Sequence, residues 1–351
     1  MESFVLYTII FLLLPLFFDN IERGKNRFYY LLFSIGLMWF MTSFRRYDVG
    51  NDTEAYHRYF NLAFTDDFNL DLRIEVGYKY LCIVISRYTN NFTIFLVITS
   101  GIIFVTLFQY VRKYGQHPFL YISLFWCLAY VPFVSPLRQS LALSVILISL
   151  PLLLNKKYFY FLFFCYVASL FHRSALVSVL LIPMMLVKPT NSRILYIVIT
   201  IMLLVFSNTI SYFNQYLDDE YYSRYFNTQS GSWAAFFNTL IGIIPLFLEK
   251  TTSIQSKKTI KPSFYILMRW GTIVYSISYL LSLHTSGMGR IAYYFMPFML
   301  SFWCFTISGL SKNNRIMTII LLFSSILSFR IIALLYRPDW NSFFPFYYVW
   351  E

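Results

Sequence analysis

Runs of about 20 apolar residues recur along the chain and leave it few ways to fold. A helix of that length crosses roughly 30 Å of hydrocarbon, and the runs lack the alternation expected of a membrane β-barrel. Since 58% of the residues are hydrophobic and 13% are charged, the chain carries more apolar surface than a soluble core would bury. We therefore predict an all-α fold, a polytopic membrane helical bundle.

Windows of this length predict about twelve transmembrane helices. They lie near 3–18, 28–44, 92–111, 118–134, 138–154, 158–171, 174–187, 194–211, 233–249, 263–283, 290–309 and 316–336. The stretch 158–187 fits either two short spans or one re-entrant hairpin, and both return the chain to its starting side. We predict a single integral membrane domain over 1–351, with an outward segment 45–91 and an outward loop 212–232.

The basic loops set the predicted orientation. The loops with few acids are 19–27, 112–117, 155–157, 188–193, 250–262 and 311–315, and they hold 15 of the 28 basic residues. The positive-inside rule places them in the cytoplasm. Both termini, the segment 45–91, the loop 212–232 and the turns near 135, 172 and 288 then face outward. Since topology accounts for much of the net charge of +12, no nucleic-acid partner is predicted.

Charged and polar residues gather at the start of the first outward segment. They are Arg45, Arg46, Asp48, Asp52, His57 and Arg58. Asn51 followed by Glu54 resembles a capping box that opens a short helix, with Tyr56, Tyr59 and Phe60 on its less polar side. A capped surface helix accounts for Asn51 and Glu54. It does not account for the charged cluster at the membrane edge, for which we predict a function.

Two outward turns each combine an arginine with a helix start. In the turn near 135, Ser135 is a good N-cap, Pro136 suits the first helical position, and Arg138 lies in the first turn. In the turn near 288, two glycines allow close approach of a ligand and Arg290 opens the next span. Free backbone N–H groups, the helix dipole and a guanidinium suit phosphate or diphosphate. The alternative is a contact with lipid phosphate.

Two residues are candidates for a general base. His172, beside Arg173 at the third outward turn, is ionisable at membrane depth, where such a group is costly without a partner or water. A neutral histidine accepts a proton from a hydroxyl nucleophile. Glu75 is the alternative base if burial raises its pKa. Arg330, toward the outward end of the last span, could join the outward arginines.

Several chemistries have no support in the sequence. The four cysteines are isolated, without the spacing of a metal or redox site. No nucleotide-binding glycine loop and no long cytoplasmic loop is present. We predict no metal, no cofactor and no soluble nucleotide-sugar donor, so the anionic partner of the arginines should arrive through the membrane or from outside.

Five short motifs follow one another on the predicted outward side. They are Arg46 with Gly50-x-Asp52, Tyr56 and Phe60; Glu75-x-Gly77-Tyr78; Leu137-Arg138-Gln139-x-Leu-Ala142; Phe171-His172-x-Ser174-Ala175; and Gly289-Arg290-x-x-Tyr293-Tyr294. In this order they resemble the EpsG/Wzy-like polysaccharide polymerases of bacteria. The resemblance covers about residues 44–300.

The resemblance implies a multi-pass enzyme of the bacterial cytoplasmic membrane. Its substrates would be polyprenyl-diphosphate-linked oligosaccharides within the membrane lipid. The growing glycan would be transferred to a sugar hydroxyl of a new unit, with release of the carrier diphosphate. A chain-length regulator and a flippase of the same pathway are the expected protein partners. The glycan class, whether O-antigen, capsule or exopolysaccharide, stays open.

The resemblance also implies roles for the outward residues. The diphosphate would be bound by Arg45, Arg46, Arg138 and Arg290. His172 or Glu75 would activate the acceptor hydroxyl, and Asp52 would order the first-loop arginines or contact sugar. Supporting roles fall to Tyr56, Gln139, Arg173 and Arg330. Because Arg45 and Arg46 are adjacent, which of them fills the family position stays open.

Two other functions fit the same features. A lipid-linked oligosaccharide flippase or exporter would also meet diphosphate and sugars, but it would place charges along a path through the bilayer. A membrane glycosyl- or acyltransferase that modifies a finished glycan would share the outward site. The first is less expected, because the candidate residues gather on one side, and the second stays open.

Overall fold

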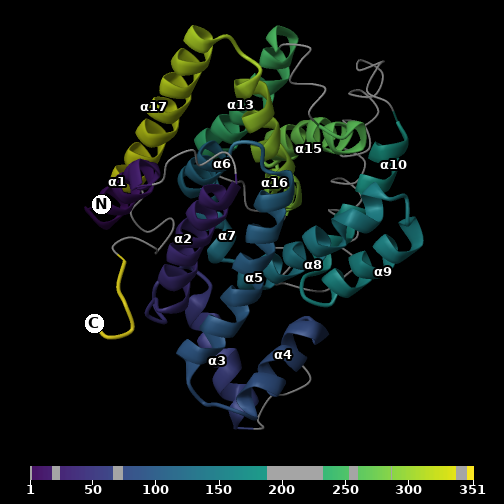
Figure 1. Cartoon of the computed structure of the whole chain (residues 1–351). Helices are drawn as coiled ribbons and strands as arrows, with labels where there is room; N and C mark the ends of the chain where they lie inside the picture. Colours follow the sequence, from purple (N-terminus) through teal and green to yellow (C-terminus); the bar gives the residue numbers. More distant parts are fainter. Residues whose placement is uncertain are drawn as a thin grey trace. The chain divides into compact units, whose positions relative to one another are not determined.

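The computed structural model describes residues 2–17, 24–65, 74–187, 232–252, 260–285, 287–336 and 346–351. Every helix or strand element assigned in these ranges is helical (Figure 1). The one β-type feature within them is an isolated bridge between Arg45 and Tyr348. The predicted all-α class is confirmed for this part of the chain.

Six helical stretches in the described ranges are long and apolar enough to cross a membrane. They are Phe92–Tyr114 (α5), Leu137–Leu154 (α8), Trp233–Thr251 (within α13, Ser232–Leu248, and η4, Glu249–Thr251), Pro262–Leu281 (α15), Gly287–Ser308 (α16) and Lys312–Tyr336 (α17). Each coincides with a predicted span. The chain is therefore a helical membrane protein.

Shorter or more polar helices occupy five further predicted spans. They are α1 (Glu2–Leu13) with η1 (Leu14–Phe17); α2 (Gly24–Ser43); α6 (Pro118–Leu124), η2 (Phe125–Ala129) and α7 (Tyr130–Val134) in one run; α9 (Tyr158–Ser169); and η3 (Arg173–Leu180) with α10 (Leu181–Leu186). The predicted span 194–211 and nearly all of the loop 212–232 lie outside the described residues. About twelve spans therefore stays a prediction.

The chain divides into two compact units. Unit 1 comprises Met1–Leu176 and Ile316–Glu351, and unit 2 comprises Val177–Arg315. Within unit 1, α5 packs between α2 and α8, α9 packs on α8, and α3 (Thr53–Phe64) packs on α4 (Val76–Ser86) (Figure 1). Within unit 2, α15 packs on α13 and on α16.

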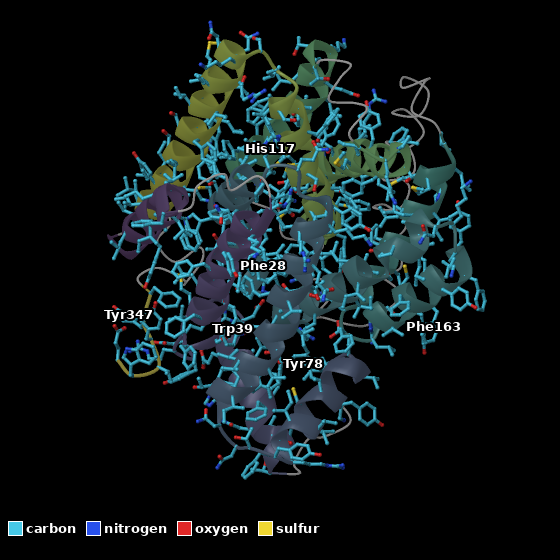
Figure 2. All side chains as sticks on the ribbon, viewed as in Figure 1. Phe28, Trp39, Tyr78, His117, Phe163 and Tyr347 are labelled. Atoms are coloured by element: carbon cyan, nitrogen blue, oxygen red, sulfur yellow. The ribbon has the colours of Figure 1, made fainter. Side chains whose placement is uncertain are left out.

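The two ends of unit 1 carry different chemistry. At one end, the Arg27 guanidinium donates to the carbonyl oxygens of Val111, Arg112 and Gly115, which lie at the end of α5. A cation at this end of a helix is favoured by the helix dipole and adds a donor to its last carbonyls, of which that of Val111 also accepts from the Gly115 N–H at 2.9 Å. His117 lies near this end, while Tyr78 lies at the opposite end of the unit (Figure 2). The two were predicted on opposite sides of the membrane.

The run from α6 to α7 contains a π-helical turn, η2. A π turn shifts the backbone bonding by one residue and leaves carbonyl groups in need of donors. Arg330 of α17 supplies them: its Nε donates to the Cys127 carbonyl oxygen at 3.0 Å and its Nη2 to that of Leu128 at 2.7 Å. Arg330 therefore stabilises the π turn of unit 1, a role that was not predicted from the sequence.

Close helix packing and an ion pair stabilise the described part of unit 2. A Cβ at Gly271 of α15 would lie 2.6 Å from the Cβ of Phe298 on α16, so glycine lets these two helices approach closely. Arg269 pairs with Glu249, with 3.0 Å between Nε and Oε2. Both side chains are mostly buried, and the pair neutralises two charges that would otherwise be costly there.

Candidate functional site

The segment 45–91, which was predicted to face outward, begins with a turn into α3. The helix starts at Thr53, with Asp52 at the N-cap position and no capping bond from its side chain. The predicted capping box of Asn51 and Glu54 is wrong, because the start lies one residue later and puts Ala55 at the third helical position. The turn is held instead by the Thr53 hydroxyl, which donates to the Val49 carbonyl oxygen at 2.7 Å.

The apolar side of α3 packs on α4 and α5. Tyr56 is 2% exposed, and its ring centroid lies 5.6 Å from that of Tyr78 on α4. Phe60 is fully buried and packs on Phe95 of α5 at 4.8 Å between ring centroids. Burial raises the pKa of the Tyr56 phenol, and the nearby Asp52 adds to the effect. Tyr56 is therefore a neutral hydroxyl at physiological pH.

Arg138 enters the same region from the first turn of α8. The helix begins at Leu137 with Pro136 at the N-cap position and no side-chain cap. The predicted N-cap, Ser135, is wrong, since Ser135 ends α7 and the proline follows it in a non-helical conformation. The predicted place of Arg138 in the first turn is confirmed.

Arg138 and Glu75 form a mostly buried ion pair. Nη1 of Arg138 lies 2.6 Å from Oε2 of Glu75, and the two side chains are 18% and 9% exposed. The guanidinium also lies over the Tyr78 ring, 6.0 Å from its centroid, and Tyr56 is a further hydrogen-bond partner. Glu75 sits at the N-cap position of α4, where a carboxylate is favoured by the helix dipole.

Arg45 is a second guanidinium that is buried in unit 1. Its side chain is 1% exposed, and Nη1 donates at 3.1 Å to the carbonyl oxygen of Val134, next to the Pro136 turn. Burial lowers the pKa of this guanidinium to about 10, against the opposing effect of Tyr130, Tyr56 and other neighbours. Arg45 therefore stays protonated at neutral pH. Its bond to Val134 places this second guanidinium beside the turn that leads to Arg138.

The turn that carries His172 is fixed against α4. The Gly77 N–H donates to the Leu170 carbonyl oxygen at 2.8 Å, two residues before His172. Nδ1 of His172 accepts from the Ser174 N–H at 3.3 Å and lies 2.7 Å from the Ser174 hydroxyl oxygen. Because a backbone N–H only donates, Nδ1 is unprotonated, and the proton of the neutral ring is on Nε2.

The EpsG family matches residues 28–348. The chain belongs to the EpsG family. Its membership indicates a membrane protein of the polysaccharide-polymerase type. No curated protein and no solved structure matches the chain.

Four of the motifs that carry the family resemblance meet in unit 1 of this EpsG-family protein. Asp52 and Tyr56 come from α3, Glu75 from the start of α4, and Arg138 from the start of α8. The bond between Gly77 and Leu170 brings the His172 motif to the same end of α4. The fifth motif lies in unit 2, where Arg290 is in the first turn of α16 and half-buried.

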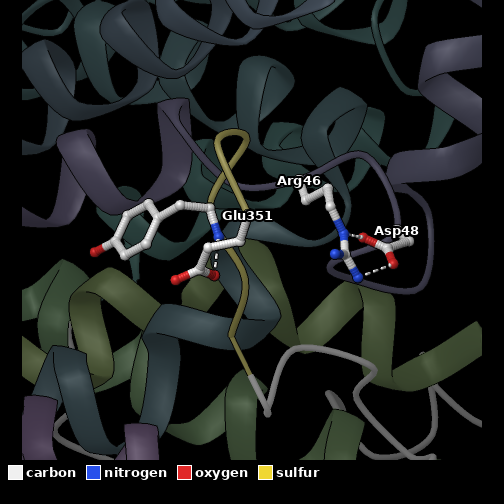
Figure 3. Close-up of polar contacts among 4 residues, drawn as sticks. Arg46, Asp48 and Glu351 are labelled. Atoms are coloured by element: carbon white, nitrogen blue, oxygen red, sulfur yellow. Dashed lines mark hydrogen bonds and ion pairs between the residues drawn. The ribbon is translucent and has the colours of Figure 1, made fainter.

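The adjacent arginines of the family motif are separated by the structure. Arg45 is buried, whereas Arg46 is at the surface and pairs with Asp48: Nε and Nη2 each donate at 2.7 Å to a different carboxylate oxygen (Figure 3). The Arg46 guanidinium also lies 4.5 Å from the Tyr347 ring centroid. Neighbouring residues of an extended stretch point in opposite directions. The structure therefore assigns the buried cation to Arg45.

The remaining candidates take different positions. Gln139 is 3% exposed on α8, next to Arg138. Arg173 is exposed at the start of η3.

Tyr130 was given no role from the sequence. It is fully buried, and its hydroxyl donates to the Met38 carbonyl oxygen at 3.3 Å. In the sequence, Tyr130 is one of 30 tyrosines and lies in an apolar run, so nothing distinguishes it from the others.

Gly77→Ala is expected to lower polymer formation at least about tenfold while leaving the protein in the membrane. A Cβ at Gly77 would lie 2.8 Å from the Leu170 carbonyl oxygen, which is closer than Cβ atoms come in proteins. Since that oxygen is backbone, α4 must shift away and carry Glu75 with it. Glycan length on a gel and protein level by immunoblot measure the two effects.

Gly36→Ala is the matched control. Gly36 lies in the interior of α2, where a Cβ would meet no atom within 4 Å. The control should make full-length glycan, because alanine favours the helix. Full-length glycan from Gly77→Ala as well would show that the contact with Leu170 does not position the candidate site.

Proposed function

We propose that this EpsG-family protein joins polyprenyl-diphosphate-linked oligosaccharide units on the outer face of the bacterial cytoplasmic membrane. The observation that carries the proposal is that two mostly buried guanidinium groups lie at the turn that begins α8, Arg138 in the first helical turn and Arg45 bonded to the Val134 carbonyl oxygen before it. Cations at membrane depth are costly unless an anion or a water-filled space offsets them. One carboxylate faces Arg138, and a lipid diphosphate is an anion whose anchor brings it to that depth.

The proposed reaction is a glycosyl transfer. The hydroxyl oxygen of the acceptor sugar attacks the anomeric carbon of the growing glycan. A new carbon–oxygen bond forms there as the bond from that carbon to the diphosphate oxygen breaks. The bonding electron pair leaves with the diphosphate, and the hydroxyl proton passes to a base. Guanidinium groups stabilise the charge that develops on the leaving diphosphate.

Arg138 and Glu75 are proposed to change partners during this reaction. Without substrate, Glu75 holds the Arg138 guanidinium in place. An arriving diphosphate, which carries more negative charge, competes for the same donors and frees the carboxylate. The freed Glu75 then accepts the proton of the acceptor hydroxyl. His172 is less suited to accept it, because Nδ1 already accepts from Ser174 and Nε2 carries the ring proton.

The other residues that were predicted to face outward keep the roles expected from the sequence. Arg46 is proposed to add a guanidinium donor for the diphosphate, and Arg290 of unit 2 is proposed as a diphosphate-binding residue on its sequence motif alone. Asp52 is among the charges that act on Arg45 and is proposed to order it. Gln139 and Arg173 keep supporting roles, and Arg330 is assigned to the π turn on the strength of its two carbonyl contacts.

Arg290→Ala is expected to abolish glycan longer than one repeat unit. Removing one preorganised donor to a developing anion lowers a rate by roughly 10² to 10³. The variant is expressed in a host that lacks its own copy of the gene, and surface glycan is separated by length on a gel. Single repeat units should still reach the surface, since export precedes the proposed step.

Lys312→Ala is the control for Arg290→Ala. Lys312 is exposed at the start of α17, in a loop predicted to face the cytoplasm. It should produce a full ladder. If the gene deletion instead removed all surface glycan and trapped single units inside the cell, the protein would be an exporter and the polymerase proposal would be wrong.

A further inference from the structure

The segment Phe346–Glu351 pairs with the loop between α2 and α3. The Arg46 N–H donates to the Tyr347 carbonyl oxygen at 3.0 Å. The Val349 N–H donates to the Phe44 carbonyl oxygen at 2.9 Å. These two bonds flank the isolated β-bridge of unit 1. The backbone of the first arginine loop is thus held by residues from the other end of the sequence.

This segment is itself anchored to α1. Phe346 is 6% exposed, and its ring packs edge-on against Tyr7 of α1 at 6.1 Å between centroids. The Tyr348 hydroxyl lies 2.8 Å from the Tyr7 hydroxyl. The turn is closed by Glu351, whose Oε2 accepts from the Tyr348 N–H at 2.9 Å (Figure 3). Because α1 holds the segment, the segment holds the arginine loop against a fixed support.

One side chain of the segment also sets the direction of Arg46. The guanidinium carbon Cζ of Arg46 lies over the Tyr347 ring, 4.5 Å from the ring centroid. Asp48 takes the Nε and Nη2 donors. An anion that approaches Arg46 would therefore meet Nη1. The Tyr347 ring and the Asp48 carboxylate restrict the rotamers of Arg46 before an anion binds, so binding costs less side-chain entropy.

We propose that the segment Phe346–Glu351 positions the outward arginine loop for anion binding, with Tyr347 as the positioning residue for Arg46. The inference rests on the proposed function, since it takes the anion to be the lipid diphosphate. It adds a role for residues that the polymerase proposal does not use. The segment acts through Arg46 and makes no contact with the reacting atoms.

Tyr347→Leu should weaken anion binding, whereas Tyr347→Phe should not. The probe is a polyprenyl diphosphate without sugar, added to the purified full chain in detergent, with affinity read from ligand-dependent thermal stabilisation. A cation–π contact at an exposed site corresponds to about a threefold change in affinity. Tyr347→Phe keeps the ring face and should stay within about twofold of wild type. Equal affinity of the leucine and phenylalanine variants would overturn the role of Tyr347.

A second pair of variants tests the backbone pairing. Val349→Pro removes the N–H that donates to Phe44, while Val349→Ala keeps it and shortens an exposed side chain. Hydrogen exchange of peptides covering residues 44–49 should speed up in the proline variant alone. The glycan ladder of that variant should shorten, with about tenfold less polymer. Faster exchange with an unchanged ladder would contradict the positioning role.

The two proposals fail in different ways. If Arg290→Ala loses the ladder while Tyr347→Leu and Val349→Pro keep wild-type diphosphate affinity and glycan length, only the positioning role is wrong. If wild-type protein does not bind the diphosphate and the gene deletion leaves glycan length unchanged, the polymerase proposal itself is wrong.

Discussion

Arg138→Met is expected to leave cells with single repeat units and no polymer. The substitution keeps most of the side-chain volume and removes the guanidinium fork that we assign to the leaving diphosphate. Loss of one such electrostatic contact lowers a rate by roughly 10² to 10³. Arg138→Lys should restore little, because an ammonium does not reproduce the two parallel bonds of a guanidinium.

The effect of Arg138→Met on folding has to be separated from its effect on catalysis. Removing the arginine leaves the Glu75 carboxylate, which is 9% exposed, without its ion-pair partner. Breaking a buried pair in this way destabilises proteins by about 3–5 kcal/mol. The double variant Arg138→Met/Glu75→Gln neutralises both groups and should recover the level of inserted protein.

The two single variants and the double variant therefore make a closed set. We expect a low level of inserted protein and no glycan ladder from Arg138→Met. The double variant should have a normal protein level and no ladder. Glu75→Gln should bind the lipid-linked donor normally but not turn it over. Arg87→Ala, an exposed arginine at the end of α4, should match wild type. A full ladder from the double variant would show that this ion pair has no part in the reaction.

Arg45→Met is expected to lower polymer formation by roughly 10². Arg45 is 1% exposed, and the substitution removes the donor that its Nη1 supplies to the Val134 carbonyl oxygen. Loss of one partner of a buried hydrogen bond costs about 1–3 kcal/mol of stability. Folded, inserted protein that makes little polymer would separate a role in the reaction from a purely structural one.

The measurement for Arg45→Met is thermal unfolding of the purified protein together with the glycan ladder. Arg46→Met is the matched control, because Arg46 is at the surface and pairs with Asp48. It should lose less polymer than Arg45→Met. A variant at Arg45 that is stable and makes full-length glycan would remove this residue from the proposed diphosphate site.

The helices were predictable because apolar runs of span length have few other folds in a bilayer. The two helix starts were predicted less well. Asn51 and Ser135 each have the chemistry of an N-cap, yet in each case the N-cap is the next residue, and the helices begin at Thr53 and Leu137. Capping preferences bias a helix start by about 1 kcal/mol. Packing of the tyrosines and the position of a proline outweigh a preference of that size.

The candidate site was predictable as a set of residues but not as a geometry. The sequence predicted that the polar residues Glu75 and Arg138 both face outward, and it offered Glu75 only as a base. Their ion pair joins residues 63 positions apart, and no local pattern encodes such a contact. The separation of Arg45 from Arg46 was equally hidden, because adjacent identical side chains have no sequence feature that tells the buried one from the exposed one.

The pairing of the first arginine loop with residues near 348 has a consequence for biosynthesis. Tyr7 and Tyr348, which bond each other beside this pairing, are 341 positions apart. During translation, the loop around Arg46 can form this pairing only after the segment Phe346–Glu351 has been made. The loop therefore reaches its paired conformation after the helices between these two parts of the sequence have been synthesised. On our proposal, a chain released before residue 346 would lack the contacts that position Arg46.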